Sequence, residues 1–254
     1  MNSVILMEIL SSSDHRKLSE LFFERFLRAL EKLSSQEDIF VGLSGGSSLD
    51  IFYAYIQSHF RNIPESIRTK IRFAFLDERI VSVDHPDSNE WQLRKKFLGT
   101  LVEEGSIGEG QIISMFPSCW DTKRPGIWNS GSFLPSGWQE LTESYSSIVP
   151  RIDIALFGVW PDGHIASLFL HHPLLTSVER WYLEITDSPK PPAHRITVSP
   201  MMIREISYPF IAFMRGKEEA FADFRDNEKS VQDCPAKMVI SDRTVGMSDI
   251  AIDR

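Results

Sequence analysis

The chain has 254 residues, 42% of them hydrophobic and 24% charged, and a formal net charge of −8. This composition is typical of a globular protein, and the length suits one α/β domain over residues 1–254. The acidic balance disfavours a nucleic-acid partner, whose protein surface is usually basic, but it allows a local cationic pocket.

Residues 1–10 contain a short apolar stretch with no basic segment before it. The stretch is too short to span a membrane, so we interpret it as a first strand and expect a cytoplasmic protein with no membrane partner. Cys119 and Cys234 stand in no CxxC or histidine-spaced pattern. We therefore expect two unreactive thiols in a reducing compartment.

Helix and strand patterns alternate from the start of the chain. Apolar residues at helical spacing predict a helix over 13–33, with Asp14 among its candidate caps. An apolar run over 39–43 predicts a strand, a Gly/Ser turn follows at 44–48, and helical spacing returns over 49–60.

The next predicted strand, over 71–76, leads into the charged sequence LDER. Turn residues then precede a helix for which Asp87 or Ser88 is the candidate cap. Residues 99–137 are rich in Gly, Pro, Ser and Trp and show weak periodicity. We expect loops and short elements there, which cover an active site.

The rest of the chain continues the alternation. Further strands are expected around Tyr182 and over 152–157, 195–198, 210–214 and 237–242. Further helices are expected from Ile165, after Pro200 and from about Lys217. Because several strands are continuous apolar runs, the pattern predicts a Rossmann-like α/β fold, a mostly parallel sheet with helices on both faces.

Ligands of such sheets bind beyond the carboxyl ends of the strands. The first polar segment there is GLSGGSS, in which Gly45, Gly46 and Ser47 can bring backbone N–H groups to an anion. This segment is neither a Walker A loop nor a GxGxxG motif, so an ordinary tight turn stays open as the alternative.

The second and third segments carry acids. Asp77 and Arg79 of LDER form either a surface ion pair or a contact to a charged substrate. His164 follows Asp162 in PDGHIASLF, at the start of a predicted helix. A helix N-terminus disfavours imidazolium, so we expect a neutral ring that acts as a general base, with a structural histidine as the alternative.

The fourth segment, DSPKPPAHRI, carries Lys190 and Arg195 on a loop that its prolines stiffen. Two cations held on a stiff loop can clamp a phosphate at a reduced ordering cost.

Together these segments resemble the 6-phosphogluconolactonase family. GLSGGSS, FAFLDERIVSVDHPDSN, DIALFGVWPDGHIASLF and DSPKPPAHRITVSP occur in the family's order and spacing, across about residues 39–200. The resemblance implies a fold like that of glucosamine-6-phosphate deaminases and ribose-5-phosphate isomerases. It also implies hydrolysis of 6-phospho-D-glucono-1,5-lactone to 6-phosphogluconate in the oxidative pentose phosphate pathway, without a metal or organic cofactor.

The resemblance also implies roles for single residues. His164 is the expected general base for the attacking water, and Asp162 and Asp77 are the expected catalytic carboxylates. Which of these acids, or which backbone carbonyl, orients the imidazole stays open. Binding of the phosphate, or polarisation of the oxyanion, is expected from Gly45, Gly46, Ser47, Arg79, Lys190 and Arg195. A placed water and a base suffice for an activated ester, which agrees with the lack of a GxSxG motif.

Some positions depart from the family pattern. Trp160 stands where the family usually has glycine, and we expect it to narrow the pocket, slow the reaction or change the substrate. Leu170 and His171 replace a usual Pro-Gly pair. The expected partner is a phosphorylated sugar lactone, and we expect a monomer or a weak homo-oligomer.

Two alternative functions remain. An amino-sugar phosphate deaminase/isomerase carries an Asn-Glu pair after the turn, where this chain has Leu168 and Phe169. A catalytically weak sugar-phosphate-binding protein needs the cations but not His164, and Trp160 is the feature that favours it.

Overall fold

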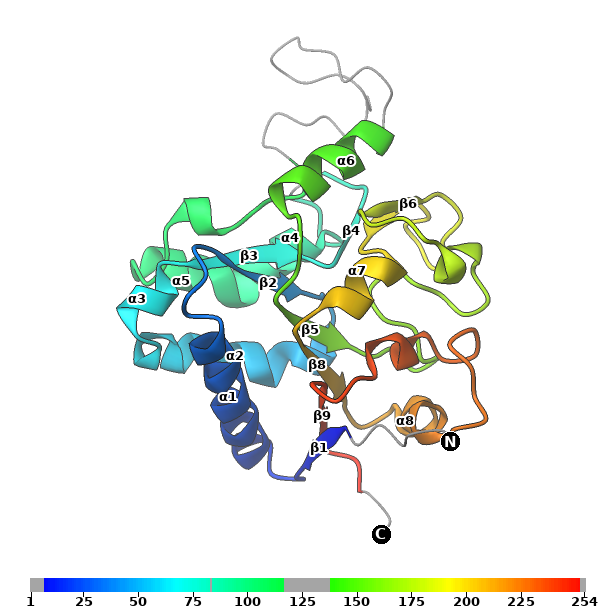
Figure 1. The fold of residues 1–254 in the computed structure, drawn as a ribbon, viewed down its shortest axis with the longest axis horizontal. Coiled ribbons are helices and arrows are strands. Elements are labelled where there is room, and N and C mark those ends of the chain that lie inside the picture. The colour runs from blue at the N-terminus through cyan, green and yellow to red at the C-terminus, as the bar shows by residue number, and fades with distance from the viewer. Residues whose placement is uncertain (1–6, 83, 117–137, 252–254) are drawn as a thin grey trace.

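The structure, a computed structural model, describes residues 7–82, 84–116 and 138–251 (Figure 1). Its strands are β1 (Glu8–Ser11), β2 (Ile39–Leu43), β3 (Ile71–Phe75), β4 (Asp77–Arg79), β5 (Ile154–Gly158), β6 (Leu183–Ile185), β7 (Arg195–Thr197), β8 (Tyr208–Phe213) and β9 (Val245–Ser248). Its helices are α1 (His15–Lys32), α2 (Asp50–His59), α3 (Glu65–Arg68), α4 (Asn89–Leu93), α5 (Gly99–Glu103), α6 (Trp138–Ile148), α7 (Pro200–Glu205) and α8 (Glu218–Arg225). No helix within these ranges is long and apolar enough to cross a bilayer.

Six of the described strands form the main sheet, in the order β1-β9-β8-β5-β2-β3. Every neighbouring pair in it is parallel. β2 and β5 are buried along their whole length, as expected for strands covered on both faces. The predicted parallel sheet is therefore confirmed.

Helices cover both faces of this sheet. Phe210 and Phe213 of β8 are three positions apart, so their side chains point to opposite faces. The ring of Phe210 lies 5.3 Å from that of Phe22 in α1, and the ring of Phe213 lies 4.9 Å from that of Phe221 in α8. Figure 1 shows α1 beside α2, with α8 on the other side of the strands.

Two predicted helix starts are confirmed by their caps. The Asp14 carboxylate accepts hydrogen bonds from the N–H groups of Arg16 and Lys17, ahead of α1. The Ser88 hydroxyl accepts from the N–H of Trp91, ahead of α4. These local bonds satisfy N–H groups that have no partner inside a helix.

A second, antiparallel sheet in the order β4-β7-β6 was not predicted. We expected β6 and β7 to join the main sheet. Instead β7 pairs with β4, which places Arg195 opposite Arg79 and Thr197 opposite Asp77. Strands of three residues carry too little periodicity to indicate a partner so distant in sequence. The pairing brings the Pro-rich loop next to the LDER segment.

The helix predicted from Ile165 is wrong. Ala166 has a left-handed backbone, with φ at +49°, and the N–H of Leu168 closes a turn onto the carbonyl of Ile165. The N–H of Ser167 donates instead to the Thr197 hydroxyl of β7, at 3.2 Å. This tertiary bond replaces the helical one, so His164 does not lie at a helix N-terminus.

The late strand predicted over 237–242 is also wrong. Residues Pro235–Val239 form a short 3-10 helix that begins at a proline. The last strand of the described chain, β9, comes after the predicted range. Short apolar runs fit both helices and strands, whereas proline favours the first turn of a helix.

Only part of the expected cover segment is described. Residues up to 116 contain α5 and a 3-10 turn over Glu109–Gln111, which agrees with the expected short elements. Residues 117–137, with Cys119, lie outside the described residues. Cys234 is buried beside Gly163.

Replacing Phe22 by Ala tests the contact between α1 and the sheet. The ring is fully buried and touches Phe52 and Phe210, so its loss should lower the free energy of unfolding by about 3–5 kcal/mol. Equilibrium urea unfolding measures this change. Val178→Ala is the control, because that side chain is 79% exposed and should change stability by less than about 0.5 kcal/mol. Equal effects of the two substitutions would contradict the packing.

Candidate active site

The predicted site residues gather beyond the carboxyl ends of β2 and β5, which are neighbours in the sheet. The strand of the main sheet that follows β2 in the chain is β3, which lies on one side of the β2–β5 pair. The strand of the main sheet that follows β5 is β8, which lies on the other side. Such a switch point leaves a crevice between the two loops that follow the strands. Here the loops are residues 44–48 and residues 159–164.

The turn after β5 brings Asp162 against His164. The distance between Asp162 Oδ1 and His164 Nδ1 is 2.6 Å. Gly163 between them has φ at +83°, and a Cβ there would lie 3.2 Å from Cys234 Sγ, so glycine suits the turn. Because a carboxylate only accepts hydrogen bonds, we assign the proton to Nδ1 and the lone pair to Nε2. Nε2 makes no hydrogen bond to the described part of the chain.

The His164 ring is buried between aromatic side chains. Its side chain is 1% exposed. The Trp160 indole stacks on the imidazole, with 5.3 Å between the ring centres and 10° between the ring planes. The centre of the Phe169 ring lies 4.6 Å from that of the imidazole. Burial lowers the pKa of His164 and outweighs the hydrogen bond to Asp162, which raises it. The neutral ring expected from the sequence is thus favoured, but by burial and not by a helix terminus.

Lys190 completes this group. Its Nζ lies 2.7 Å from Asp162 Oδ2 and 3.4 Å from His164 Nδ1. Burial acts to raise the pKa of Asp162, but the hydrogen bonds and charges of His164 and Lys190 hold that pKa well below its ordinary range. The Asp162 carboxylate therefore stays ionised and can orient the imidazole.

Arg195, which the sequence predicts to contact the phosphate or polarise the oxyanion, directs its N–H groups to the Pro-rich loop. The guanidinium donates to the carbonyls of Lys190, Pro191 and Pro192 at 3.0–3.2 Å. A further N–H reaches the Ser167 hydroxyl at 3.3 Å. Arg195 is 3% exposed, so it fixes the loop that carries Lys190.

Asp77 does not contact His164. Its carboxylate accepts hydrogen bonds from the Ser167 hydroxyl at 2.7 Å and from Asn89 Nδ2 at 3.2 Å. Of the candidates for orienting the imidazole, Asp162 therefore makes the contact. Asp77 instead faces a narrow hollow of about 10 Å³, which is lined by Ser44, Gly45, Asp77, Arg79, Asn89, Gly158, Trp160 and Ala166.

This hollow collects polar atoms that lack partners. Among the described residues, the buried atoms without a hydrogen bond include Ser44 Oγ, Arg79 Nε and Asn89 Oδ1. The orientation of the Asn89 amide is defined, because Nδ2 donates to two oxygens of Asp77. Buried polar groups usually have partners, so this cluster is suited to a polyhydroxylated ligand.

Sequence reasoning did not single out Ser44 or Asn89 as site residues. Asn89 could have been identified from its place in the family motif, where it ends the segment DHPDSN that follows LDER. The glycine at position 45 also has a structural explanation, because a Cβ there would lie only 2.1 Å from Asn89 Oδ1.

Buried Glu78 holds Asn89 in place. Its carboxylate accepts from the N–H groups of Arg79, Asn89 and Glu90 at 2.7–2.8 Å and from the Ser88 hydroxyl at 2.9 Å. Burial raises the pKa of Glu78 to about 7, against the lowering effect of these bonds. The carboxylate thus ties the first turn of α4 to β4.

A second hollow, of about 40 Å³, is suited to an anion. It is lined by Gly45, Gly46, Ser47, Ser48, Gly158, Val159, Trp160 and Lys217. Lys217 Nζ donates to the Ser48 hydroxyl at 2.6 Å and to the Val159 carbonyl, and it forms no ion pair with the described residues. Burial and the charge of Lys190 lower its pKa. Lys217 was not among the predicted site residues, although it follows a predicted strand.

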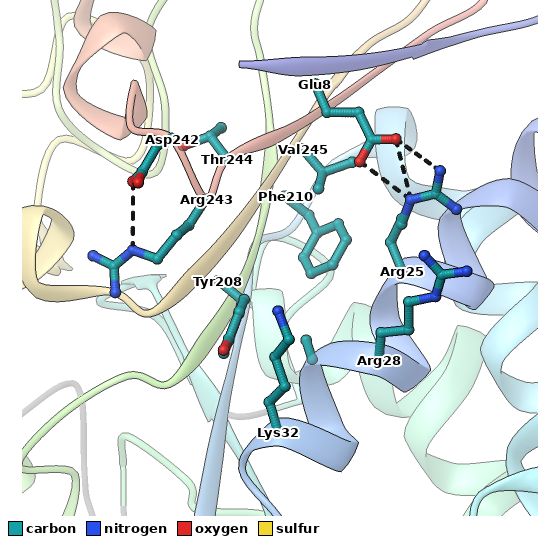
Figure 2. Close-up of a pocket in the computed structure, with 11 residues that line it drawn as sticks. Glu8, Arg25, Arg28, Lys32, Tyr208, Phe210, Asp242, Arg243, Thr244 and Val245 are labelled. Carbon is teal, nitrogen blue, oxygen red and sulfur yellow. Dashed lines mark hydrogen bonds and ion pairs between the residues drawn. The ribbon is translucent and has the colours of Figure 1, made fainter. Parts of the chain in front are cut away.

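A larger hollow, of about 270 Å³, lies at the opposite edge of the sheet, beside the first residues of β1, β8 and β9 (Figure 2). Arg25 there is paired with Glu8 at 2.7 Å, and Arg28 with Glu24 at 2.5 Å. The hollow has no histidine lining it and none of the predicted site residues, so we do not assign an activity to it. Within the described ranges, no cluster of His, Cys, Asp and Glu is suited to a metal ion.

The fold and the site define an α/β protein with a carboxylate–imidazole pair and a lysine-lined hollow at the switch point of a parallel sheet. A family model described as glucosamine-6-phosphate isomerases/6-phosphogluconolactonase matches residues 13–247. The chain belongs to this family of enzymes, which confirms the resemblance of its motifs.

Individual relatives agree with the family. The chain is 28% identical to the 6-phosphogluconolactonase of Rattus norvegicus over 232 residues, which is 87% of this chain and 80% of that protein. It is 31% identical to probable 6-phosphogluconolactonase 4, chloroplastic, of Oryza sativa subsp. indica over 70% of this chain, and it spans about half (53%) of that protein. The 6-phosphogluconolactonase structure from Trypanosoma brucei shares the fold, with a TM-score of 0.75, 18% identity, and 96% of each chain covered.

Titration of His164 tests the acid–imidazole pair. We expect its pKa to lie below 6.5, because burial lowers it, and to fall further in Asp162→Asn, which removes a charge that raises it. NMR of the imidazole signals against pH measures both values. Asp187→Asn is the control, because that carboxylate pairs with His172 at 3.0 Å and should leave His164 unchanged. A pKa above 6.5, or no shift in Asp162→Asn, would refute the assignment.

Proposed function

We propose that this chain hydrolyses 6-phospho-D-glucono-1,5-lactone to 6-phosphogluconate. The observation that carries the proposal is the 2.6 Å contact of Asp162 with His164 Nδ1, which leaves the lone pair on Nε2. The Trp160 indole that stacks on this imidazole also lines the hollow with the glycine loop and Lys217. The motifs and the family membership support the same reaction. Relatives in the family are named for it.

The steps follow from the ordinary chemistry of esters. His164 Nε2 takes a proton from water as the water oxygen attacks the lactone carbonyl carbon. The tetrahedral intermediate carries an oxyanion, which a nearby cation stabilises, with Arg79 as the candidate. The bond from the carbonyl carbon to the ring oxygen then breaks, and the imidazolium returns its proton to that oxygen. Asp162 stabilises the imidazolium between the two transfers.

The two hollows suit the two ends of this substrate. The hollow with Gly46, Ser47 and Lys217 offers a glycine loop, a hydroxyl and an uncompensated cation, which favours the phosphate. The hollow with Ser44 and Asn89 offers unpartnered polar atoms, which favours the sugar hydroxyls.

The proposal places the reaction in the oxidative pentose phosphate pathway. A cytoplasmic location and a monomeric or weakly associated state accompany it as predictions. An amino-sugar phosphate deaminase is less well supported, because Leu168 and Phe169 after the turn are buried and apolar.

Hydrolysis of freshly made phosphorylated lactone, measured against its spontaneous opening, tests the proposal. His164→Ala should lower kcat by about 10²–10⁴-fold, the usual contribution of a general base. His194→Ala is the control, because its exposed imidazole lies on the same Pro-rich loop. In the wild type kcat/KM should fall on the acid side below pH 6.5. A wild type that does not accelerate opening, with phosphate still bound, would instead favour a sugar-phosphate-binding protein.

Lys217→Met tests the anion pocket separately. Loss of one charge-assisted hydrogen bond should weaken binding of inorganic phosphate by about tenfold or more and raise KM more than it lowers kcat. Titration calorimetry measures the binding. Lys70→Met is the control, since Nζ of Lys70 bonds the Ser34 carbonyl away from the site. Unchanged phosphate binding in Lys217→Met would place the phosphate elsewhere.

A further inference from the structure

Trp160 stands where the two hollows of the site meet. Its indole lines both of them, and its Cζ2 lies 4.0 Å from where a Cβ on Gly46 would lie. On its other side it stacks on the His164 ring. The indole therefore separates the glycine loop from the base.

This position blocks access to His164. The imidazole is 1% exposed, and the hollow with Asn89 holds about 10 Å³, which is room for about one water. A sugar lactone cannot lie between the glycine loop and the imidazole while the indole is there. Binding of such a substrate requires the indole to move.

Two lysines hold the indole in this position. Lys190 Nζ lies 5.0 Å from the centre of the Trp160 ring and Lys217 Nζ lies 5.8 Å from it, within the range of cation–π contacts. A phosphate dianion attracts both ammonium groups more strongly than a neutral ring does. Phosphate and indole therefore compete for the same two cations.

We propose that Trp160 is the specificity-determining residue of this site and makes access to His164 depend on a phosphate group. A phosphorylated substrate draws Lys190 and Lys217 off the indole, which then leaves the imidazole and opens the space for the lactone carbonyl. A lactone without phosphate leaves the cation–π contacts intact and meets a closed site. This inference rests on the proposed function and adds a chain-specific basis for selecting the substrate.

Kinetics of Trp160→Gly provide the first test. The ratio of kcat/KM for 6-phosphoglucono-δ-lactone to kcat/KM for glucono-δ-lactone should fall about tenfold or more, the scale of a desolvated cation–π contact. The fall should come from a faster reaction of the unphosphorylated lactone. Trp181→Phe is the control, because its indole is 39% exposed and lines neither hollow. Its ratio should match the wild type.

Tryptophan fluorescence provides a test that does not need turnover. Inorganic phosphate should change the emission of the wild type and of Trp181→Phe, and most of this change should be lost in Trp160→Phe, which keeps an aromatic ring. Calorimetry with the same phosphate shows that Trp160→Phe still binds it. The urea midpoint of each variant establishes that it is folded.

The outcomes separate the two proposals. An unchanged kcat/KM ratio in Trp160→Gly, or a full fluorescence change in Trp160→Phe, overturns the role of Trp160 even if the lactone is hydrolysed. A phosphate-dependent signal that requires Trp160, in a protein that hydrolyses neither lactone, supports the displacement of the indole and overturns the proposed reaction.

Discussion

The site depends on one contact, the hydrogen bond between the Asp162 carboxylate and Nδ1 of His164. It assigns the proton to one ring nitrogen and leaves a lone pair on the other. Gly163 makes the contact possible through its left-handed backbone, and Lys190 keeps the carboxylate ionised from its other oxygen. Removing any of these three partners would change either the direction or the basicity of the imidazole.

The surrounding elements support this contact by fixing loops. Arg195 is one example. The sequence predicts that it contacts the phosphate or the oxyanion, and its N–H groups donate to carbonyls of the Pro-rich loop. The energetic reason is burial, because a buried guanidinium must satisfy its N–H groups within the protein. Glu78 likewise fixes a segment of the chain. Its carboxylate accepts hydrogen bonds from the first turn of α4 and from β4, and so holds Asn89 in place. The same motifs therefore contain residues that line the site, such as Asn89, and residues that hold these in place, such as Glu78.

Trp160 illustrates how one side chain acts on several groups. The indole lowers the exposure of His164, which favours the neutral ring, and it places an apolar face next to two lysines. The same burial that tunes the imidazole also restricts what can reach it. A glycine at this position would remove the indole that lines both hollows and stacks on His164. The selectivity that we propose and the low exposure of the imidazole thus depend on the same residue.

The sequence by itself determined the parallel sheet, the helix caps at Asp14 and Ser88, and the segments that form the site. These follow from local signals: buried strands read as continuous apolar runs, and caps and glycine turns act within a few residues. The Asp162–His164 pair was visible for the same reason, since its members are two positions apart.

Only the tertiary structure decided the antiparallel pairing of β4 with β7, the turn at Ala166 in place of a helix, and the contacts of Arg195, Asn89 and Lys217. Each depends on groups far apart in the chain, such as the Ser167 N–H that bonds Thr197 instead of its own helix. Burial also decided that the pKa of His164 is lowered, because the aromatic rings that exclude water from it gather only in the folded chain.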